Sequence, residues 1–339
     1  MSSPVAWGEL NDEQLLDQNI ARLGLRIEGT EVAPFVQQLY AELDAKGLSF
    51  HPPCHVGDEW FCPVGIPAIF IPFFLLHPRL RELERKQILE VEGENPGWFM
   101  RLMRHEAGHA YSFAYRLQHR KKWQQHFGRS SPEETDTYRP RPYSRSFVIH
   151  LQDWYAQSAP DEDWAETFAV WLTPGLDWRT RYKDWKALQK LEYTEELMSS
   201  LRNKPPVHEP RFRVGEYNCL NLKLKTFYAR KRKAYADSFP DFYDKDLLKL
   251  FAAKESDGGT EKASAYLRRR RRQIVDAVST WSNEHKFRID QLSKKIIDRC
   301  DELTLRVSTA NTLIDLQVAT YVTSLTMNYL FTGRFKRTK

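Results

Sequence analysis

Apolar residues recur at intervals of three and four over much of the chain, and this pattern predicts a predominantly helical protein. We expect a first helix within residues 9–28 and a second over Glu31–Lys46, which Gly47 would end. Each has one apolar face and is interpreted as a packing element. A charged helix with an exposed face is expected over His77–Glu90.

The pattern changes over Ser49–Leu76, where Pro, Gly and aromatic residues predict a small sheet with turns. Within it, Ile66–Phe74 has the composition of a strand. Its prolines cannot donate to a ladder and favour an edge strand, to which a peptide could add by main-chain hydrogen bonds. A core strand with turn prolines is an equally good interpretation.

A longer helix should begin at Asn95-Pro96, since Asn is a favoured N-cap and Pro a favoured first helical residue. Its apolar stripe continues toward Gly128. Gly108 lies in the helix interior, where it costs about 1 kcal/mol relative to Ala. Its presence therefore indicates that another segment approaches the helix closely.

The middle of the chain begins with Gly128–Arg145, which has few signs of regular structure and is predicted to be a loop. A helix with an acidic first turn should then start near Pro160 and end at Thr173-Pro174-Gly175. A further helical stretch is expected over Trp178–Leu197.

The C-terminal part is set off by a boundary at Lys204–Pro210 and a break at Ser256–Thr260. Helices are expected over 261–282 and Asn311–Phe331. The predicted organisation is a first domain over 1–203, a connecting segment over 204–260 and a helical C-terminal domain over 261–339. Arg268–Arg272 would point all round the first of these helices, which favours a solvated helix over a site for an acidic peptide and disfavours nucleic acid.

Composition adds constraints on the class of protein. The 339 residues are 41% hydrophobic, and 51 Lys and Arg against 45 Asp and Glu give a net charge of only +6. The first residues show no signal peptide, and no apolar run is long enough to span a bilayer. Four scattered cysteines without a Cys-x-x-Cys pair are typical of reduced thiols, so a cytoplasmic protein is expected.

The candidate chemistry lies in the helix that begins at Asn95, which contains His105-Glu106-Ala-Gly-His109. In a helix, His105 and His109 lie one turn apart on one face, so both can bind one zinc ion at about 2.0–2.1 Å. Glu106 is offset by one residue and would lie beside the metal, where it could hold a water. The alternative is a buried helix with two histidines by coincidence.

A catalytic zinc usually has three protein ligands, so one more is needed. Glu162 and Glu166 are four residues apart and share one face of the predicted helix at Pro160. Two carboxylates in an otherwise apolar helix are costly unless each has a partner. A zinc ion and a ligand histidine would supply both.

This arrangement resembles the gluzincin metallopeptidases and, over Glu162-Asp-Trp-Ala-Glu166-Thr-Phe, the anthrax lethal-factor-like and Pro-Pro endopeptidase group. The resemblance implies that Glu162 is the third ligand, that Glu166 supports a ligand histidine, and that Tyr155, seven residues before Glu162, donates to the oxyanion. Glu166 as the ligand with Glu162 outside, and His150 as the ligand, remain alternatives. Tyr155 could also have a structural role only.

From the N-terminus to about Leu201, the chain is also similar to an uncharacterised bacterial family described as zinc-binding metallopeptidases. Some of those relatives begin with a Cys-x-x-Cys zinc ribbon, which this chain lacks. The resemblance implies a zincin-like catalytic domain with a small N-terminal sheet and edge strand, within an α+β and predominantly helical protein. The helical C-terminal domain follows it.

The sequence thus predicts a zinc-dependent peptide hydrolase with one Zn²⁺ per chain and Glu106 as general base and acid. Its partner would be a peptide or protein substrate, an acidic one included; the sequence does not indicate an oligomeric state. The alternatives are a non-catalytic zinc-containing binding protein, and a protease directed to a polyanion by the arginine run. A second metal site at His51, Cys54, His55 and Cys62 is disfavoured by its spacing, so both cysteines are interpreted as core thiols.

Overall fold

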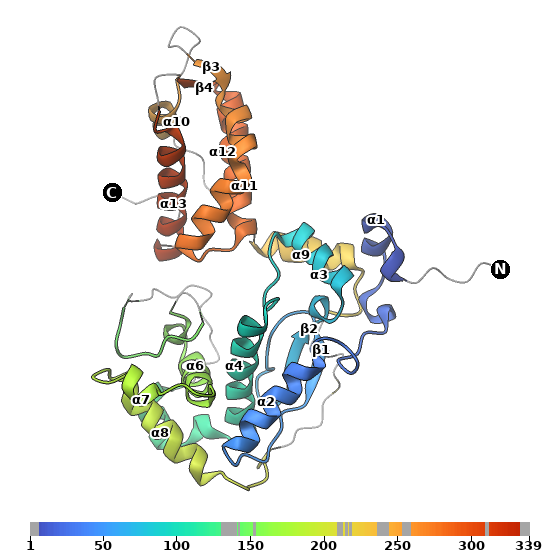
Figure 1. Cartoon of the computed structure of the whole chain (residues 1–339), viewed down its shortest axis with the longest axis vertical. Coiled ribbons are helices and arrows are strands. Elements are labelled where there is room, and N and C mark those ends of the chain that lie inside the picture. The colour runs from blue at the N-terminus through green and yellow to red at the C-terminus, as the bar shows by residue number, and fades with distance from the viewer. Residues whose placement is uncertain are drawn as a thin grey trace, which may run out of the picture. The chain divides into compact units, whose positions relative to one another are not determined.

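The computed structural model describes residues 7–129, 141, 143–151, 154–208, 213, 216, 219–235, 244–252, 259–308 and 312–332. The chain divides into two units, one of Met1–Lys86 with Val91–Phe227 and one of Gln87–Glu90 with Tyr228–Lys339. The division after Phe227 falls inside the expected connecting segment 204–260. Helices predominate and the described strands form two small sheets, which confirms a predominantly helical α+β protein (Figure 1).

The N-terminal helix is shorter than expected. In place of one helix within 9–28 there are α1 (Asp12–Leu16) and a 3₁₀ turn (Ile20–Leu23). Asn19 accounts for the break, because its side chain accepts the Ala21 N–H at 3.0 Å and so caps a new turn. The second predicted helix is α2 (Ala33–Ala45), and Gly47 follows it with a left-handed φ of 75°.

The small sheet consists of β1 (Cys54–Gly57) and β2 (Ile69–Pro72), which pair in parallel with Cys54 opposite Ile69. β2 is buried along its whole length. Phe61 also forms an antiparallel bridge with Phe70 on the other side of β2. In the described two-stranded sheet β2 lies at an edge, as predicted, while its burial and the bridge to Phe61 agree with the alternative of a packed core strand.

Along the chain, three helices follow the sheet and come before the predicted loop at Gly128–Arg145. They are α3 (Pro78–Ile88), α4 (Pro96–Ala114) and α5 (Lys121–Phe127). Asn95 caps α4 as expected, since its side chain accepts the Trp98 N–H at 2.8 Å. α4 does not continue to Gly128, because Arg116 takes a left-handed φ of 51° and turns the chain. Most of the loop predicted at Gly128–Arg145, residues 130–140 and 142, is outside the described residues.

The core of the first unit is built on the contact between α4 and α6 (Pro160–Leu172), which lie side by side in Figure 1. α6 begins and ends where the sequence predicted. A Cβ on Gly108 would come within 2.8 Å of the Ala165 Cα, which confirms the expected close approach. The Trp164 indole N–H donates to the Gly108 carbonyl at 2.7 Å and fixes this contact. α7 (Trp178–Arg181) and α8 (Ala187–Ser200) follow.

The second unit is mainly helical. After α9 (Leu224–Tyr235), in which the division falls, come α10 (Asp244–Leu250), β3 (Gly259–Lys262), α11 (Ala263–Ser282), α12 (Lys286–Glu302), β4 (Arg306–Ser308) and α13 (Ile314–Thr332). β3 and β4 pair in an antiparallel manner, and buried aliphatic side chains of α11, α12 and α13 form the core. α11 and α13 match the predicted helices, whereas α12 was not expected.

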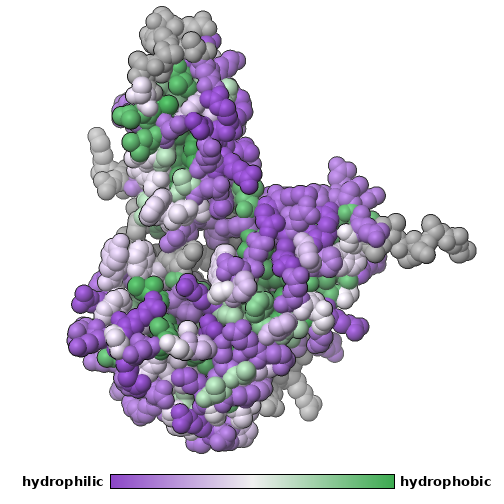
Figure 2. Space-filling model, viewed as in Figure 1, coloured by the Kyte–Doolittle hydropathy of each residue, from purple (hydrophilic) through white to green (hydrophobic). Residues whose placement is uncertain are grey.

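The arginine run on α11 is engaged with carboxylates of its own unit. Arg268, Arg269, Arg270 and Arg271 form ion pairs, in this order, with Asp301, Glu261, Asp315 and Asp290. On the face shown in Figure 2, hydrophilic residues predominate over the described surface. These pairs agree with the interpretation of a solvated helix and leave little free charge for a polyanion.

Two expectations from composition can be compared with the structure. Among the described helices, none is both long and apolar enough to cross a membrane. None of the four cysteines forms a disulfide.

Candidate metal centre

His105 and His109 come from the middle of α4, and both side chains turn toward α6. Their Nε2 atoms lie 3.1 Å apart. His105 is 3% exposed and His109 9% exposed, so water cannot replace a lost partner easily. The one-turn spacing thus brings the two imidazoles to one point, as the sequence predicted.

Glu162, in the first turn of α6, meets both histidines with one oxygen. Its Oε2 lies 3.0 Å from the His105 Nε2 and 3.3 Å from the His109 Nε2. The group His105, His109 and Glu162 is near enough to hold a metal ion. Within the part of the chain that the structure describes, no other group of three such side chains comes this close.

The donor set fits zinc in both chemistry and size. Ligands at 2.0–2.1 Å around a tetrahedral zinc lie about 3.3 Å from one another, and the three atoms here are separated by 3.0–3.3 Å. If both imidazoles are neutral with the proton on Nδ1, their Nε2 lone pairs face each other at this distance and repel. A cation between them removes the repulsion and balances the Glu162 charge.

Glu166 fixes the orientation of His105 by binding Nδ1, the ring nitrogen that does not face Glu162. The His105 Nδ1–H donates to the Glu166 Oε1 at 2.9 Å, and the Leu151 N–H donates to the Oε2 at 2.8 Å. Because Nδ1 carries the proton, the Nε2 lone pair is left for a metal. Glu166 is 1% exposed, and both of its oxygens are in use.

The charges of the site oppose the effect of burial. Burial alone would lower the pKa of His105, but Glu162 and Glu166 raise it well above its ordinary value. At His109, burial also acts to lower the pKa, but the nearby Glu162 carboxylate raises it, and the net shift is upward. For Glu162 itself, burial would raise the pKa, yet the two histidines hold it well below its usual range. The site thus favours an ionised Glu162 and a positive charge at the two histidines.

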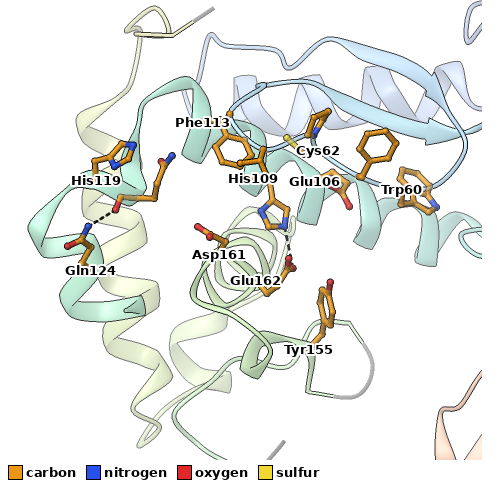
Figure 3. A pocket seen from close by; sticks show the side chains of 15 residues that line it. Trp60, Cys62, Glu106, His109, Phe113, His119, Gln124, Tyr155, Asp161 and Glu162 are labelled. Carbon is orange, nitrogen blue, oxygen red and sulfur yellow. Dashed lines mark hydrogen bonds and ion pairs between the residues drawn. The ribbon is translucent and has the colours of Figure 1, made fainter. Parts of the chain in front are cut away.

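Glu106 faces the cavity rather than the three donor atoms. Its side chain lines a pocket with a volume of about 850 Å³, together with His109 and Glu162 (Figure 3). Burial raises the pKa of Glu106, while the two histidines act to lower it. A carboxyl group with a raised pKa beside a metal site is suited to accept and return a proton.

Tyr155 lies at the same pocket. Its ring centroid is 5.7 Å from that of His105, and the residue is 37% exposed. Figure 3 shows its hydroxyl directed toward the space between Glu106 and Glu162. The structure therefore brings together all six residues that the sequence singled out for the site.

Two other candidates are not part of the group. The His150 Nε2 lies 3.0 Å from the Arg101 carbonyl, and burial lowers the pKa of His150 to about 4. His51 pairs with Asp44, and the Cys62 thiol donates to the Ile66 carbonyl at 3.2 Å. The alternative ligand His150 and the second metal cluster thus find no support among the described contacts.

The rest of the pocket was missed by the sequence analysis. It is lined by the segment 60–65 and by residues of α4, the turn after it, α5 and α6: Phe113, Gln118, His119, Gln124 and Asp161. No periodicity or motif marks these positions, because they meet only through the turn at Arg116 and the crossing of α4 and α6. The one local signal was the Pro- and aromatic-rich composition of 60–65.

No protein-family model, curated protein or solved structure matches this chain. The geometry of the site and the His-Glu-x-x-His motif are therefore what indicate a function for this chain.

Proposed function

We propose that the chain is a zinc metallopeptidase of gluzincin type, with a zincin-like catalytic domain in the first unit. The observation that carries the proposal is the convergence of the His105, His109 and Glu162 donor atoms within 3.0–3.3 Å of one another, with Glu106 facing the adjoining pocket. The proposed ligands are these three residues, with one Zn²⁺ per chain. The substrate is a peptide or protein.

The residues of the pocket have distinct tasks in this proposal. A bound zinc ion would polarise the scissile carbonyl and make the attacking water more acidic. Glu106 accepts the proton of that water and passes it to the leaving amine. The Tyr155 hydroxyl donates to the carbonyl oxygen as negative charge develops there. Glu166 keeps His105 in the tautomer that binds metal.

The two other candidate functions are less well supported. A non-catalytic zinc protein has no need for a buried carboxylate such as Glu106, which is 6% exposed and faces the pocket. A protease directed to a polyanion would need free arginines on α11, and four of the five arginines form ion pairs within their own unit.

The test measures zinc content and peptide cleavage on the same samples of wild type, Glu162→Ala and Glu166→Ala. We expect one zinc per chain in the wild type, loss of zinc with Glu162→Ala, and weaker retention with Glu166→Ala. The wild type should cleave peptides of a mixed library faster than either variant, or be the only one of the three to cleave them. Zinc without cleavage of any peptide would contradict the peptidase, and absence of zinc would contradict the metal centre.

A further inference from the structure

Tyr182 lies at the end of α7 and holds the segment 149–151, which is neither helix nor strand. The Ile149 N–H donates to the Tyr182 hydroxyl at 3.1 Å, and this hydroxyl donates to the Ile149 carbonyl at 3.2 Å. Tyr182 is 1% exposed, so water cannot easily replace these two bonds. The segment is therefore fixed at its first residue.

The second residue of the segment is fastened to α4. The His150 Nε2 lies 3.0 Å from the Arg101 carbonyl oxygen, and because a carbonyl can only accept, this nitrogen carries the proton. Burial lowers the pKa of His150 to about 4, so the ring is uncharged at neutral pH. Arg101 lies one helical turn before His105. The segment is thus tied to the helix that carries two of the proposed zinc ligands.

The third residue reaches the metal centre through Glu166. The Leu151 N–H donates to the Glu166 Oε2 at 2.8 Å, while the Oε1 accepts the His105 Nδ1–H at 2.9 Å. One carboxylate therefore joins the segment to a ligand ring. A displacement of the Leu151 backbone would shift this carboxylate, and the His105 ring would lose the orientation that directs its Nε2 toward the metal.

We propose that Tyr182 is a positioning residue for the metal centre, which acts on His105 through the segment 149–151 and Glu166. The inference rests on the proposed zinc-binding function. Tyr182 is not part of the donor group and does not line the pocket. Its task is to keep the Leu151 N–H where Glu166 can accept it. Zinc then meets a ligand that is already oriented, and binding does not have to order the groups that support it.

Tyr182 could instead serve only the core, since its ring packs against that of Trp185 with the centroids 5.3 Å apart. The matched control for that role is Tyr115→Phe. Tyr115 is 3% exposed, its hydroxyl donates to the Lys204 carbonyl at 2.7 Å, and it belongs to neither the donor group nor the pocket lining. Each substitution removes one buried hydroxyl and keeps the ring, so a general effect on stability should appear in both.

The experiment measures the zinc affinity of the full chain by competition with a zinc indicator, together with urea unfolding of the same samples. Tyr182→Phe should bind zinc about three- to tenfold more weakly, as expected for the loss of one or two hydrogen bonds. Tyr115→Phe should keep the affinity of the wild type. In a chain that carries Glu166→Ala, the segment is no longer joined to His105, so adding Tyr182→Phe should weaken zinc binding no further.

A second readout follows the His105 ring itself. In the zinc-bound chain labelled with ¹⁵N-histidine, NMR should show that the His105 Nδ1 proton exchanges with water faster in Tyr182→Phe than in the wild type, and no faster in Tyr115→Phe. His150→Leu removes the bond to the Arg101 carbonyl and should weaken zinc binding in the same direction. This variant supplies the same test if Tyr182→Phe does not fold.

The outcomes separate the positioning role from the proposed function. Zinc binding by the wild type with unchanged affinity in Tyr182→Phe would overturn the positioning role and leave the metal centre standing. A loss of affinity that is equally large in the Glu166→Ala background, or that Tyr115→Phe shares, would also overturn it, because Tyr182 would then act through general stability. Absence of zinc from the wild type would overturn the proposed function and the positioning role together.

Discussion

At the scale of single residues, the three acidic groups of the site differ in what they touch. Glu162 contacts both histidines with one oxygen, whereas Glu166 contacts His105 and the Leu151 N–H. Glu106 makes no hydrogen bond to another described residue and faces the pocket. Their substitution should therefore separate metal binding, ligand orientation and proton transfer.

Glu106→Gln is expected to keep zinc and lose turnover. Glutamine has nearly the same shape but cannot accept a proton, so the rate should fall by about 10²–10⁴-fold. Because Glu106 is not among the three donor atoms, the zinc content should equal that of the wild type. Metal analysis and kcat on one sample provide the measurement, and activity that survives the substitution would contradict the role of Glu106.

Glu166→Gln is expected to weaken zinc binding without abolishing it. The amide cannot accept from both His105 and the Leu151 N–H, so one of the bonds of 2.9 and 2.8 Å is lost. Loss of such a support typically costs about 10–100-fold in metal affinity. Competition with a zinc indicator measures the change.

The matched control for this prediction is Glu195→Gln. Glu195 also accepts two hydrogen bonds, from the Trp171 indole N–H at 2.8 Å and the Ser199 hydroxyl at 3.1 Å, and it lies outside the metal group. Its substitution should leave zinc affinity unchanged. An equal loss of affinity in both variants would mean that Glu166 acts only through general stability.

At the scale of elements, the site depends on how closely α4 and α6 cross. Gly108 makes the crossing possible, because its missing Cβ leaves room for the Ala165 backbone. The crossing places Glu162 opposite His105 and His109. The distance between the two helices thus determines whether the three donor atoms can share one ion.

Gly108→Ala should destabilise the first unit and weaken zinc binding. The new Cβ would lie 2.8 Å from the Ala165 Cα and 3.2 Å from the Ala165 carbonyl oxygen, and backbone atoms cannot yield cheaply. Such overpacking costs about 1–3 kcal/mol, against a gain of about 1 kcal/mol in helix propensity. Urea unfolding and zinc titration measure both effects.

Gly97→Ala provides the comparison within the same helix. Its Cβ would meet only the Asn95 Oδ1, at an ordinary 3.6 Å. We expect no loss of stability and no change in zinc affinity. If Gly108→Ala behaved like Gly97→Ala, the close crossing would not be what holds the site together.

Element boundaries with a local cause could be predicted from the sequence. Asn95 fixes the start of α4 by its own side chain, and Pro160 and Thr173 mark the ends of α6. The end of α4 could not be predicted, because it depends on a left-handed backbone at Arg116 that arginine does not favour. The burial of β2 could not be predicted for the same reason, since the bridge from Phe61 to Phe70 is a tertiary contact.

The same distinction applies to the site. The spacing of His105 and His109 is local and was sufficient to predict that they meet. The choice between Glu162 and Glu166 required the register of α6 against α4, which the pattern alone left open.

At the scale of the whole molecule, the proposed metal site and the arginine network belong to different units. The donor group lies in Val91–Phe227, whereas the ion pairs of α11 lie in Tyr228–Lys339. A ligand stabilises the part of a protein that must be folded to bind it, by about 4 kcal/mol at a thousandfold excess over Kd. Removal of zinc should therefore affect the two units unequally.

Hydrogen exchange followed by peptide mass analysis can measure this for each unit in one sample. With zinc present, amides of α4 and α6 should be protected more strongly than after chelation, while those of α11 and α12 should not change. Glu162→Ala should show the chelated pattern in both conditions, because it lacks a donor. Asp290→Ala should instead affect the second unit and leave the first unchanged. Asp290 pairs with Arg271 at 3.0 Å and with Lys294 at 2.7 Å, so its loss should lower the protection of amides in the second unit by about 1 kcal/mol. Equal loss of protection in both units on chelation would show that they unfold as one and would contradict their independence.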